Sequence, residues 1–424
     1  MRYLEPCGWR STVVTTRDQD YWILDPTLLE EIPRSAEVLR VGGMTAGKIL
    51  LALARAGFPV QEAQGARRAG AFKALRSLQR WMFLPDAYRG WSQAALRAGD
   101  ARLREGGIDA LWTTSSPESA HLAGLALRKK HHVPWVADFR DPWVGRVTYR
   151  SPTPWHEARH RAMEGRVIHA ADRVTLVSEA LVAMYRKRYP EVDPSRFVYL
   201  PNGFDSDDWR RALWGEDRSS GARGPDRSPE RAFVLLHAGQ LAHRPTVHTL
   251  LDAARRAVER DPAAARDLRL RFLGGNEEIG TQEEAGYGLG PVLEIQPSRP
   301  HIESLAEMSR ASALLLLGHG GAADALLYTG KIYEYLSSGR PVIAILDEGP
   351  AADLIRSTAA GIVFRPGDTD AVAAALENQL EAWRAGKDQA VPIPPDRLAS
   401  WERRNLASQA AGILEEIASA TARK

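Results

Sequence analysis

Two kinds of segment alternate along the chain: short apolar runs, and longer stretches in which apolar residues recur every three or four positions. The pattern is clearest in the second half, where the apolar runs are four to six residues long. Such runs predict buried strands, and the helical period predicts helices between them. The predicted strands span residues 233–238, 268–273, 292–296, 312–317, 342–346 and 361–364. Strands and helices alternating in this way predict a doubly wound parallel sheet.

The first half has a similar rhythm with less regular strands. They are predicted at residues 11–16, 36–41, 109–114, 133–138, 172–178 and 196–200. A chain of 424 residues exceeds one ordinary hydrophobic core, so two domains are expected. Gly, Ser, Pro and charged residues without periodicity fill 211–231, which predicts an exposed linker. The predicted domains are therefore residues 1–210 and 232–396, followed by a C-terminal helix at 397–424.

Composition is that of an ordinary globular protein, with 44% hydrophobic and 26% charged residues. The net charge of +3 gives no argument for nucleic acid, and none is predicted as a partner. Cys7 is the single cysteine, which excludes an intrachain disulfide and fits a reducing compartment. We therefore expect a cytoplasmic protein.

The segment YTGKIYEYLSSGRPVIAI, residues 328–345, predicts a helix that ends at Gly339 and a buried strand after it. Glu334 lies in the middle of this helix, between two tyrosines. Burying a carboxylate costs free energy unless other groups donate hydrogen bonds to it. A ribose with two adjacent hydroxyls would supply such donors. The alternative is an ordinary surface glutamate on a core helix.

KIYEYLSSGRPV, residues 331–342, resembles the donor-site segment of family-4-type (glycosyltransferase group 1) retaining glycosyltransferases. PNGFD at 201–205 and ADFRDPW at 137–143 fit the same family. The resemblance implies the α/β GT-B fold, two Rossmann-like domains facing a cleft, with the C-terminal helix returning to the first domain. It implies a hexosyltransferase-type enzyme moving sugar from a nucleotide-diphosphate sugar to a hydroxyl, with retained configuration and no cofactor. A glycan, lipid-linked or small-molecule acceptor would fit, as in polysaccharide biosynthesis.

The resemblance also implies roles for donor-side residues. The helix glutamate of the family holds the nucleotide ribose, which is the role expected for Glu334. Gly239, after the strand at 233–238, would let the backbone approach the diphosphate. Arg244 and Lys331 would neutralise the leaving diphosphate, and Arg244 is the catalytic candidate among them.

Two further donor-binding candidates, Asn202 and Gly203, come from PNGFD. Both residue types tolerate the left-handed backbone of a tight turn, so a plain turn is the alternative.

Many relatives carry a second glutamate eight positions before the ribose glutamate, facing the transferred sugar. In this chain that position is Leu326.

On the acceptor side, the strand at 109–114 is followed by SSPESAHL. The family often has a Ser-Pro element here, which enters a helix whose N-terminus faces the cleft. A helix N-terminus binds anions or hydroxyls. Ser116 is therefore an acceptor-side candidate and His121 a catalytic one, with a structural role for His121 equally open.

The strand at 133–138 ends in ADFRDPW, which places Asp138, Arg140 and Asp141 at the carboxyl end of a buried strand. Open α/β sheets bind their ligands there. Asp138 is a catalytic candidate, and Arg140 and Asp141 are acceptor-side candidates. The alternative is an Arg140–Asp pair that props the loop.

HExxH, the zinc-protease pattern, occurs at residues 156–160. We reject it because Arg159 would stand beside the metal and because Arg161 and Arg166 indicate a solvated face. No third ligand stands out, although Glu164 is conceivable. No metal is therefore predicted.

Residues 66–83 combine five basic residues with an apolar stripe. Such a helix can lie on an anionic membrane surface, here the inner face, or it can be a core helix with a solvated basic face. Both interpretations stay open.

Two other functions are considered. GHGGAA at 318–323 fits a weak dinucleotide fingerprint, with Asp347 after the next strand, and would indicate an NAD-dependent oxidoreductase. A non-catalytic GT-B homologue acting as a partner subunit is the other, and Leu326 favours it.

The family resemblance begins part-way into the first βα unit, so we expect either a product that begins upstream or a poor enzyme. The alternative is that another segment fills that place.

Overall fold

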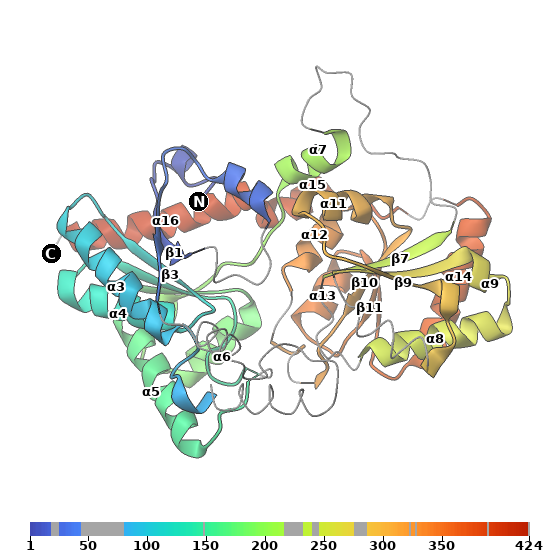
Figure 1. Cartoon of the computed structure of the whole chain (residues 1–424), viewed down its shortest axis with the longest axis horizontal. Coiled ribbons are helices and arrows are strands. Elements are labelled where there is room, and N and C mark those ends of the chain that lie inside the picture. The colour runs from blue at the N-terminus through green and yellow to red at the C-terminus, as the bar shows by residue number, and fades with distance from the viewer. Residues whose placement is uncertain are drawn as a thin grey trace, which may run out of the picture. The chain divides into compact units, whose positions relative to one another are not determined.

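The computed structural model describes residues 1–17, 25–43, 80–146, 149–215, 232–239, 246–274, 286–321, 324–326, 329–387 and 390–422. The chain forms two compact units (Figure 1). Unit 1 contains Met1–Pro201 and Ala407–Lys424, and unit 2 contains Asn202–Leu406. Each unit is built on parallel strands with helices packed against them. The predicted α/β architecture of two Rossmann-like units is therefore confirmed.

Unit 2 contains a six-stranded parallel sheet in the order β12-β11-β10-β7-β8-β9. Its strands are β7 (Phe233–Ala238), β8 (Leu268–Leu273), β9 (Leu293–Gln296), β10 (Ala313–Leu317), β11 (Val342–Ile345) and β12 (Gly361–Phe364). The order reverses between β7 and β10. Open α/β sheets bind ligands beyond the carboxyl ends of their strands at such a point. The predicted doubly wound sheet is present, and its ligand-binding edge follows from its topology.

Helices cover both faces of this sheet (Figure 1). Alternate residues of a strand point to opposite faces, so Val234 and Leu236 pack in one core while Phe233 and Leu235 pack in the other. The first core includes α11 (His301–Arg310), α12 (Lys331–Ser337) and α13 (Pro350–Ser357). The second includes α8 (Thr246–Arg260) and α14 (Thr369–Arg384). Burial on both faces explains why β7, β10 and β11 are apolar at nearly every position.

The described strands of unit 1 fall into two parallel sheets, β1-β2 and β3-β4-β5-β6. The strands are β1 (Thr12–Thr16), β2 (Glu37–Val41), β3 (Leu111–Ser115), β4 (Trp135–Phe139), β5 (Arg173–Leu176) and β6 (Phe197–Tyr199). The longer helices are α3 (Arg89–Arg104), α4 (Ser119–His131), α5 (Pro154–Ala170) and α6 (Glu179–Arg188). On α16 (Arg403–Ala422), Ile413 and Ile417 pack against Val136 of β4.

The boundaries of the units differ from the predicted domain limits at 210 and 397. On α7 (Ser206–Trp214), Trp209 donates from Nε1 to Ser337 Oγ at 2.7 Å, which ties α7 to α12. The N–H of Phe204 also donates to the carbonyl of Trp401, just before α16, at 3.1 Å. Both contacts keep these segments in unit 2. The remaining short helices are α9 (Ala264–Asp267), α15 (Pro395–Leu398) and the 3-10 turns Glu5–Cys7, Pro26–Glu31, Pro194–Arg196, Gly290–Val292 and Ala399–Trp401.

Candidate functional site

Two glycines bring the backbone loops after β7 and β8 together at the ligand-binding edge of unit 2. Gly239 has φ +112° and its N–H donates to Leu273 O at 2.6 Å. Gly274 has φ +147°, and a Cβ there would stand 2.6 Å from the carbonyl carbon of Gly239. Glycine adopts such φ values without strain and leaves room for close approach. Gly239 therefore presents bare backbone at the end of β7.

Lys331, the first residue of α12, lies over Gly239. A Cβ at position 239 would stand 2.5 Å from Lys331 Cε and would collide with its Nζ. Two predicted donor-binding residues are thus adjacent, and a positive charge stands at the backbone expected to approach a diphosphate. Arg244, the third residue of this predicted group, lies outside the described residues.

Glu334 follows one helical turn after Lys331. Its side chain is 15% exposed, and its ion-pair contact is His301 Nε2 at 3.7 Å. Within the described residues its carboxylate accepts no hydrogen bond. Burial raises the pKa of Glu334, while His301, Arg403 and Lys331 oppose the rise. A buried carboxylate without donors is costly, so this site fits a ligand that brings hydroxyl donors.

The structure separates the two candidates of the PNGFD segment. Asn202 lies near the start of α12, since a Cβ on Gly330 would be 3.7 Å from the Asn202 side chain. A Cβ on Gly203 would stand 2.6 Å from Leu406 Cδ1 and would collide with Trp401 O. Neither Asn202 nor Gly203 has a positive φ, so the left-handed-turn explanation is wrong. Close packing accounts for a glycine at position 203, and its donor contact stays a prediction.

In the described part of the GHGGAA loop after β10, residues 318–321, the backbone does not form a free phosphate cradle. The N–H groups of His319 and Gly320 donate to the carboxylate of Asp324 at 2.8 and 3.1 Å. The N–H of Gly321 donates to Asp347. The backbone donors that a dinucleotide would need are therefore occupied by the chain's own carboxylates. This arrangement argues against the oxidoreductase interpretation.

In unit 1, Asp138 at the end of β4 is buried with both oxygens engaged. Its Oδ2 accepts from Thr114 Oγ1 at 2.8 Å and from Arg140 Nε at 2.7 Å. Its Oδ1 accepts from Thr175 Oγ1 at 2.7 Å. Arg140 also donates to Leu200 O at 3.4 Å. These contacts join three strand ends and a loop. They therefore favour the structural alternative, in which the Arg140–Asp138 pair stabilises the loop, over the catalytic role expected for Asp138.

His121 of α4 lies in the core of unit 1 with no solvent exposure. Its Nδ1 is 2.8 Å from Thr113 Oγ1, and its ring stacks on Phe139 at 4.5 Å between centroids. Burial lowers the pKa of His121 to about 3, which keeps the ring neutral. A substrate cannot reach this ring unless the core opens. These observations favour the structural role for His121 over the expected catalytic one.

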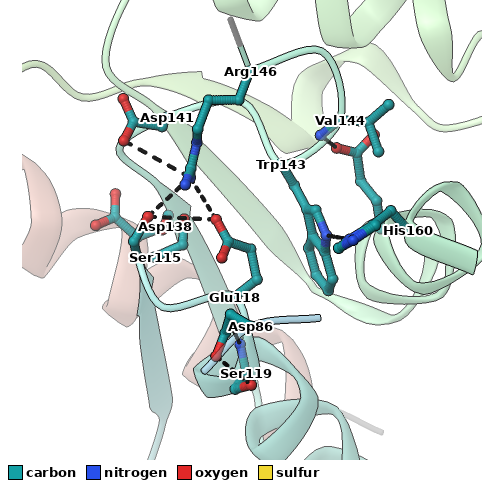
Figure 2. A network of polar contacts seen from close by, with 12 residues as sticks. Asp86, Ser115, Glu118, Ser119, Asp138, Asp141, Trp143, Val144, Arg146 and His160 are labelled. Atoms are coloured by element: carbon teal, nitrogen blue, oxygen red, sulfur yellow. Dashed lines mark hydrogen bonds and ion pairs between the residues drawn. The ribbon is translucent and has the colours of Figure 1, made fainter. Parts of the chain in front are cut away.

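The N-terminus of α4, predicted to bind an anion or hydroxyl, is capped by the chain itself. Asp86 accepts from the N–H of Ser119 at 2.7 Å and from its hydroxyl at 2.8 Å (Figure 2). Burial and the neighbouring charge of Glu118 raise the pKa of Asp86 to about 6. The predicted helix-terminal site is thus already occupied by a carboxylate.

Arg146 connects two of the acceptor-side candidates and was not predicted. It pairs with Glu118 and lies 3.8 Å from Asp141 (Figure 2). It also donates to Ser116 Oγ at 2.8 Å. Ser116 is exposed and the Asp141 side chain is 43% exposed, so both can meet a ligand. Burial raises the pKa of Asp141 and Arg146 opposes this shift. Arg146 lies in a loop without periodicity, where no sequence signal marks it.

The HExxH histidines lie on a buried face, which corrects the solvated face assumed from the sequence. His160 contacts Trp143 Nε1 at 2.9 Å and Tyr149 OH at 3.1 Å through its two ring nitrogens. His156 Nδ1 is 2.7 Å from the Thr153 hydroxyl. Glu164, which is fully buried, also lies on α5. Its carboxylate accepts hydrogen bonds from tyrosine, arginine and backbone donors. The described part of the chain contains no group of three potential ligands arranged to hold a metal.

Two family models match the chain. The description "Glycosyltransferase Family 4" covers residues 44–208, and "Glycosyl transferases group 1" covers residues 232–382. The chain belongs to the family 4, group 1 glycosyltransferases. The predicted family is confirmed.

A similar curated protein is the D-inositol 3-phosphate glycosyltransferase of Geodermatophilus obscurus. It is 28% identical over 280 residues, which are 63% of this chain and 58% of that protein. The chain spans less than two thirds of the length of the curated relatives that it matches.

Two solved structures show the fold. The α,α-trehalose-phosphate synthase (UDP-forming) from Burkholderia xenovorans, in complex with glucose-6-phosphate, has a TM-score of 0.63 at 11% identity; the match covers 96% of this chain and 100% of that chain. Anabaena Alr3699/HepE in complex with UDP-glucose has a TM-score of 0.58 at 16% identity, covering 96% and 99%. At such identities the likeness shows the GT-B fold alone, which confirms the predicted fold class.

Proposed function

We propose that this glycosyltransferase moves a sugar from a nucleoside-diphosphate sugar to a hydroxyl acceptor, with retention of anomeric configuration. The observation that carries the proposal is Glu334, a largely buried carboxylate that accepts no hydrogen bond from the described residues, one turn from Lys331. Ribose hydroxyls would supply the missing donors, and a diphosphate would meet the Lys331 ammonium. Together they match the two ends of a nucleoside diphosphate.

The diphosphate leaves with developing negative charge, which the site must stabilise. Lys331 and the bare backbone at Gly239 stand at the point where this charge would form. Arg244 is proposed to add a second cation there. In this scheme the positive charges of Lys331 and Arg244 stabilise the leaving diphosphate without a metal ion.

The acceptor is proposed to contact the exposed Ser116 and Asp141 side chains in unit 1, together with the less exposed Arg146 that joins them. The Asp141 carboxylate can accept a hydrogen bond from an acceptor hydroxyl, and the Arg146 guanidinium can donate to one. Asp138 would act indirectly, by fixing the end of β4 and Arg140 beside this group. A glycan, a lipid-linked sugar or a small polyol all fit this chemistry.

A panel of nucleotide sugars tests the proposal. UDP-glucose is the first probe because it is bound in Anabaena Alr3699/HepE and because the Burkholderia synthase is UDP-forming. A ligand at 100 times its dissociation constant stabilises the folded state by about 2.7 kcal/mol, which a thermal shift detects. Anomeric proton signals of the product then report retention. Binding without turnover would favour the non-catalytic alternative, and failure of every nucleotide sugar to bind would overturn the proposal.

We further propose that unit 1 touches an anionic membrane surface, as expected for a cytoplasmic enzyme with a lipid-linked acceptor. Residues 66–79 of the predicted basic helix lie outside the described residues. The described end of that segment exposes Trp81 and Met82 by 54% and 62%, and Trp155 is exposed by 59%. His156 packs edge-on against both tryptophan rings, at 5.1 and 4.9 Å, which groups them on one surface.

Arginines accompany these aromatic side chains. Arg159 lies 5.7 Å over the Trp155 ring, and Arg80 is exposed beside Trp81 in the sequence. Exposed tryptophans with neighbouring arginines suit the headgroup layer of an anionic bilayer. None of the helices in the described ranges is long and apolar enough to cross a membrane. Contact would therefore be made at the surface.

Vesicle flotation tests this contact with phosphatidylglycerol and phosphatidylcholine vesicles. Binding to the anionic vesicles should fall on adding salt and in the double variant Trp81→Ser/Trp155→Ser. Trp214→Ser is the matched control, since Trp214 is also 54% exposed but belongs to unit 2. Equal flotation of the wild type and the double variant would contradict the membrane proposal.

A further inference from the structure

Three helices of unit 2 bring two carboxylates to the same imidazole nitrogen. His301 Nε2, on α11, lies 3.7 Å from Glu334 Oε1 on α12 and 3.7 Å from Asp208 Oδ2 on α7. The Asp208 side chain is 1% exposed. His301 thus stands between the carboxylate assigned to the ribose and a second, fully buried one.

Two negative charges this close and this buried repel each other strongly unless a donor or cation lies between them. Charged and titratable groups face Glu334 from four elements. His301 of α11, Arg403 of α16 and Lys331 of α12 favour its ionised form, whereas Asp208 of α7 opposes it. Arg403 lies 3.5 Å from Asp208 Oδ2, so it compensates Asp208 more directly than Glu334. His301 is the group placed to serve both carboxylates.

The backbone fixes where His301 stands. It is the first residue of α11, directly after Pro300, and the Pro300 carbonyl accepts from Ser304 N–H at 3.0 Å in the first turn of the helix. Proline restricts its own φ, so the entry to the helix is rigid. α11 also belongs to the same core as α12, through Leu305 and Ile332. The imidazole is therefore held beside Glu334 by the fold and not only by its own contacts.

We propose that His301 is a positioning residue that holds the Glu334 carboxylate in the orientation that binds the nucleotide ribose. This inference rests on the proposed function, because it assumes that Glu334 meets a ribose. His301 itself need not touch the nucleotide. Without the imidazole, Glu334 would move away from Asp208 and lose its alignment to the two ribose hydroxyls.

The test is discrimination between ribose and deoxyribose, measured by calorimetry with UDP, GDP and the 2′-deoxy form of each. For the preferred base, the wild type should bind the ribonucleotide roughly tenfold or more tightly, the effect of a hydrogen bond to a charged acceptor. In His301→Ala this ratio should fall to that of Glu334→Ala. The double variant should show no further loss, because the two residues act as one unit. If the alanine variant does not fold, the same ratio of ribonucleotide to deoxyribonucleotide affinity is measured in His301→Leu.

A general loss of structure would weaken both nucleotides equally and leave the ratio unchanged, and that result would overturn the role of His301. His248→Ala is the control, since His248 is an exposed histidine of α8, on the other face of the sheet. It should keep the wild-type ratio. A wild type that binds nucleotides without preferring ribose overturns the assignment of Glu334 and this inference with it. A wild type that binds none of the four probes overturns the proposed function itself.

Discussion

Lys331 occupies the space that a side chain at position 239 would need. A Cβ on Gly239 would stand 2.5 Å from Lys331 Cε. The glycine after β7 and the lysine that opens α12 therefore form one structural unit at the edge of the sheet where ligands bind. Replacing either residue should change donor binding in a distinguishable way.

Gly239→Ala should weaken binding of UDP roughly tenfold or more, because the added methyl displaces the Lys331 ammonium and the φ of +112° is strained for alanine. Calorimetry with UDP measures this. Gly367→Ala is the control: Gly367 has φ +92°, and a Cβ there meets nothing within 4 Å. The control should lose stability but keep UDP affinity. Equal UDP affinity in both variants would contradict the phosphate role of the β7 loop.

Lys331→Met keeps the length of the side chain and removes its charge. The loss in UDP affinity should be about 1.5 to 3 kcal/mol, as for a charge-assisted hydrogen bond, while uridine without phosphates should bind nearly unchanged. Titration of both ligands into the variant, and into the exposed control Lys387→Met, measures the difference. If uridine and UDP weakened together, Lys331 would act on the nucleoside end and not on the diphosphate.

Asp86 should make the stability of unit 1 depend on pH. Its pKa is raised to about 6 in the folded protein from an ordinary value of 3.8, so the folded state binds a proton more tightly than the unfolded chain. That contribution is fully present below about pH 3.8 and is lost as pH rises through about 6. Asp86→Asn mimics the protonated form, so its stability should not fall as pH rises through about 6.

Thermal unfolding at pH 4.5 and pH 7.5 measures this effect. The variant should gain stability relative to the wild type at pH 7.5 and should match it more closely at pH 4.5. Asp193→Asn is a control of opposite character, because hydrogen bonds from Ser195 lower the pKa of Asp193. A pH-independent difference between Asp86→Asn and the wild type would contradict the raised pKa.

Several features could be predicted from the sequence because they depend on local pattern. The central strands β7, β10 and β11 of unit 2 are buried on both faces, so each appears as a nearly continuous apolar run. The helix at Lys331–Ser337 combines helical period, a turn before it and Gly339 after it, which has φ +70°. Glu334 stood out for the same reason, as a charged residue inside an apolar pattern.

Other features depend on residues distant in sequence, and no local pattern reveals them. Asp86 caps α4 from 33 positions away, which leaves the predicted anion site occupied. The buried state of His121 and the partners of Asp138 follow from how β3, β4 and β5 align. The charged neighbours of His156 and His160 in the sequence predict a solvated face for these histidines. The charged neighbours Arg159 and Arg161 are indeed exposed, whereas His156 and His160 are buried.

The central claim, that this chain binds a nucleoside diphosphate through Glu334, is tested most directly by calorimetric titration of UDP and GDP into the wild type and into Glu334→Ala. Glu303→Ala is the control, since Glu303 is an exposed glutamate on neighbouring α11. We predict that Glu334→Ala loses roughly 1.5 to 3 kcal/mol of binding free energy for the preferred nucleotide. Glu303→Ala should match the wild type. Equal affinity of Glu334→Ala and the wild type would contradict the account.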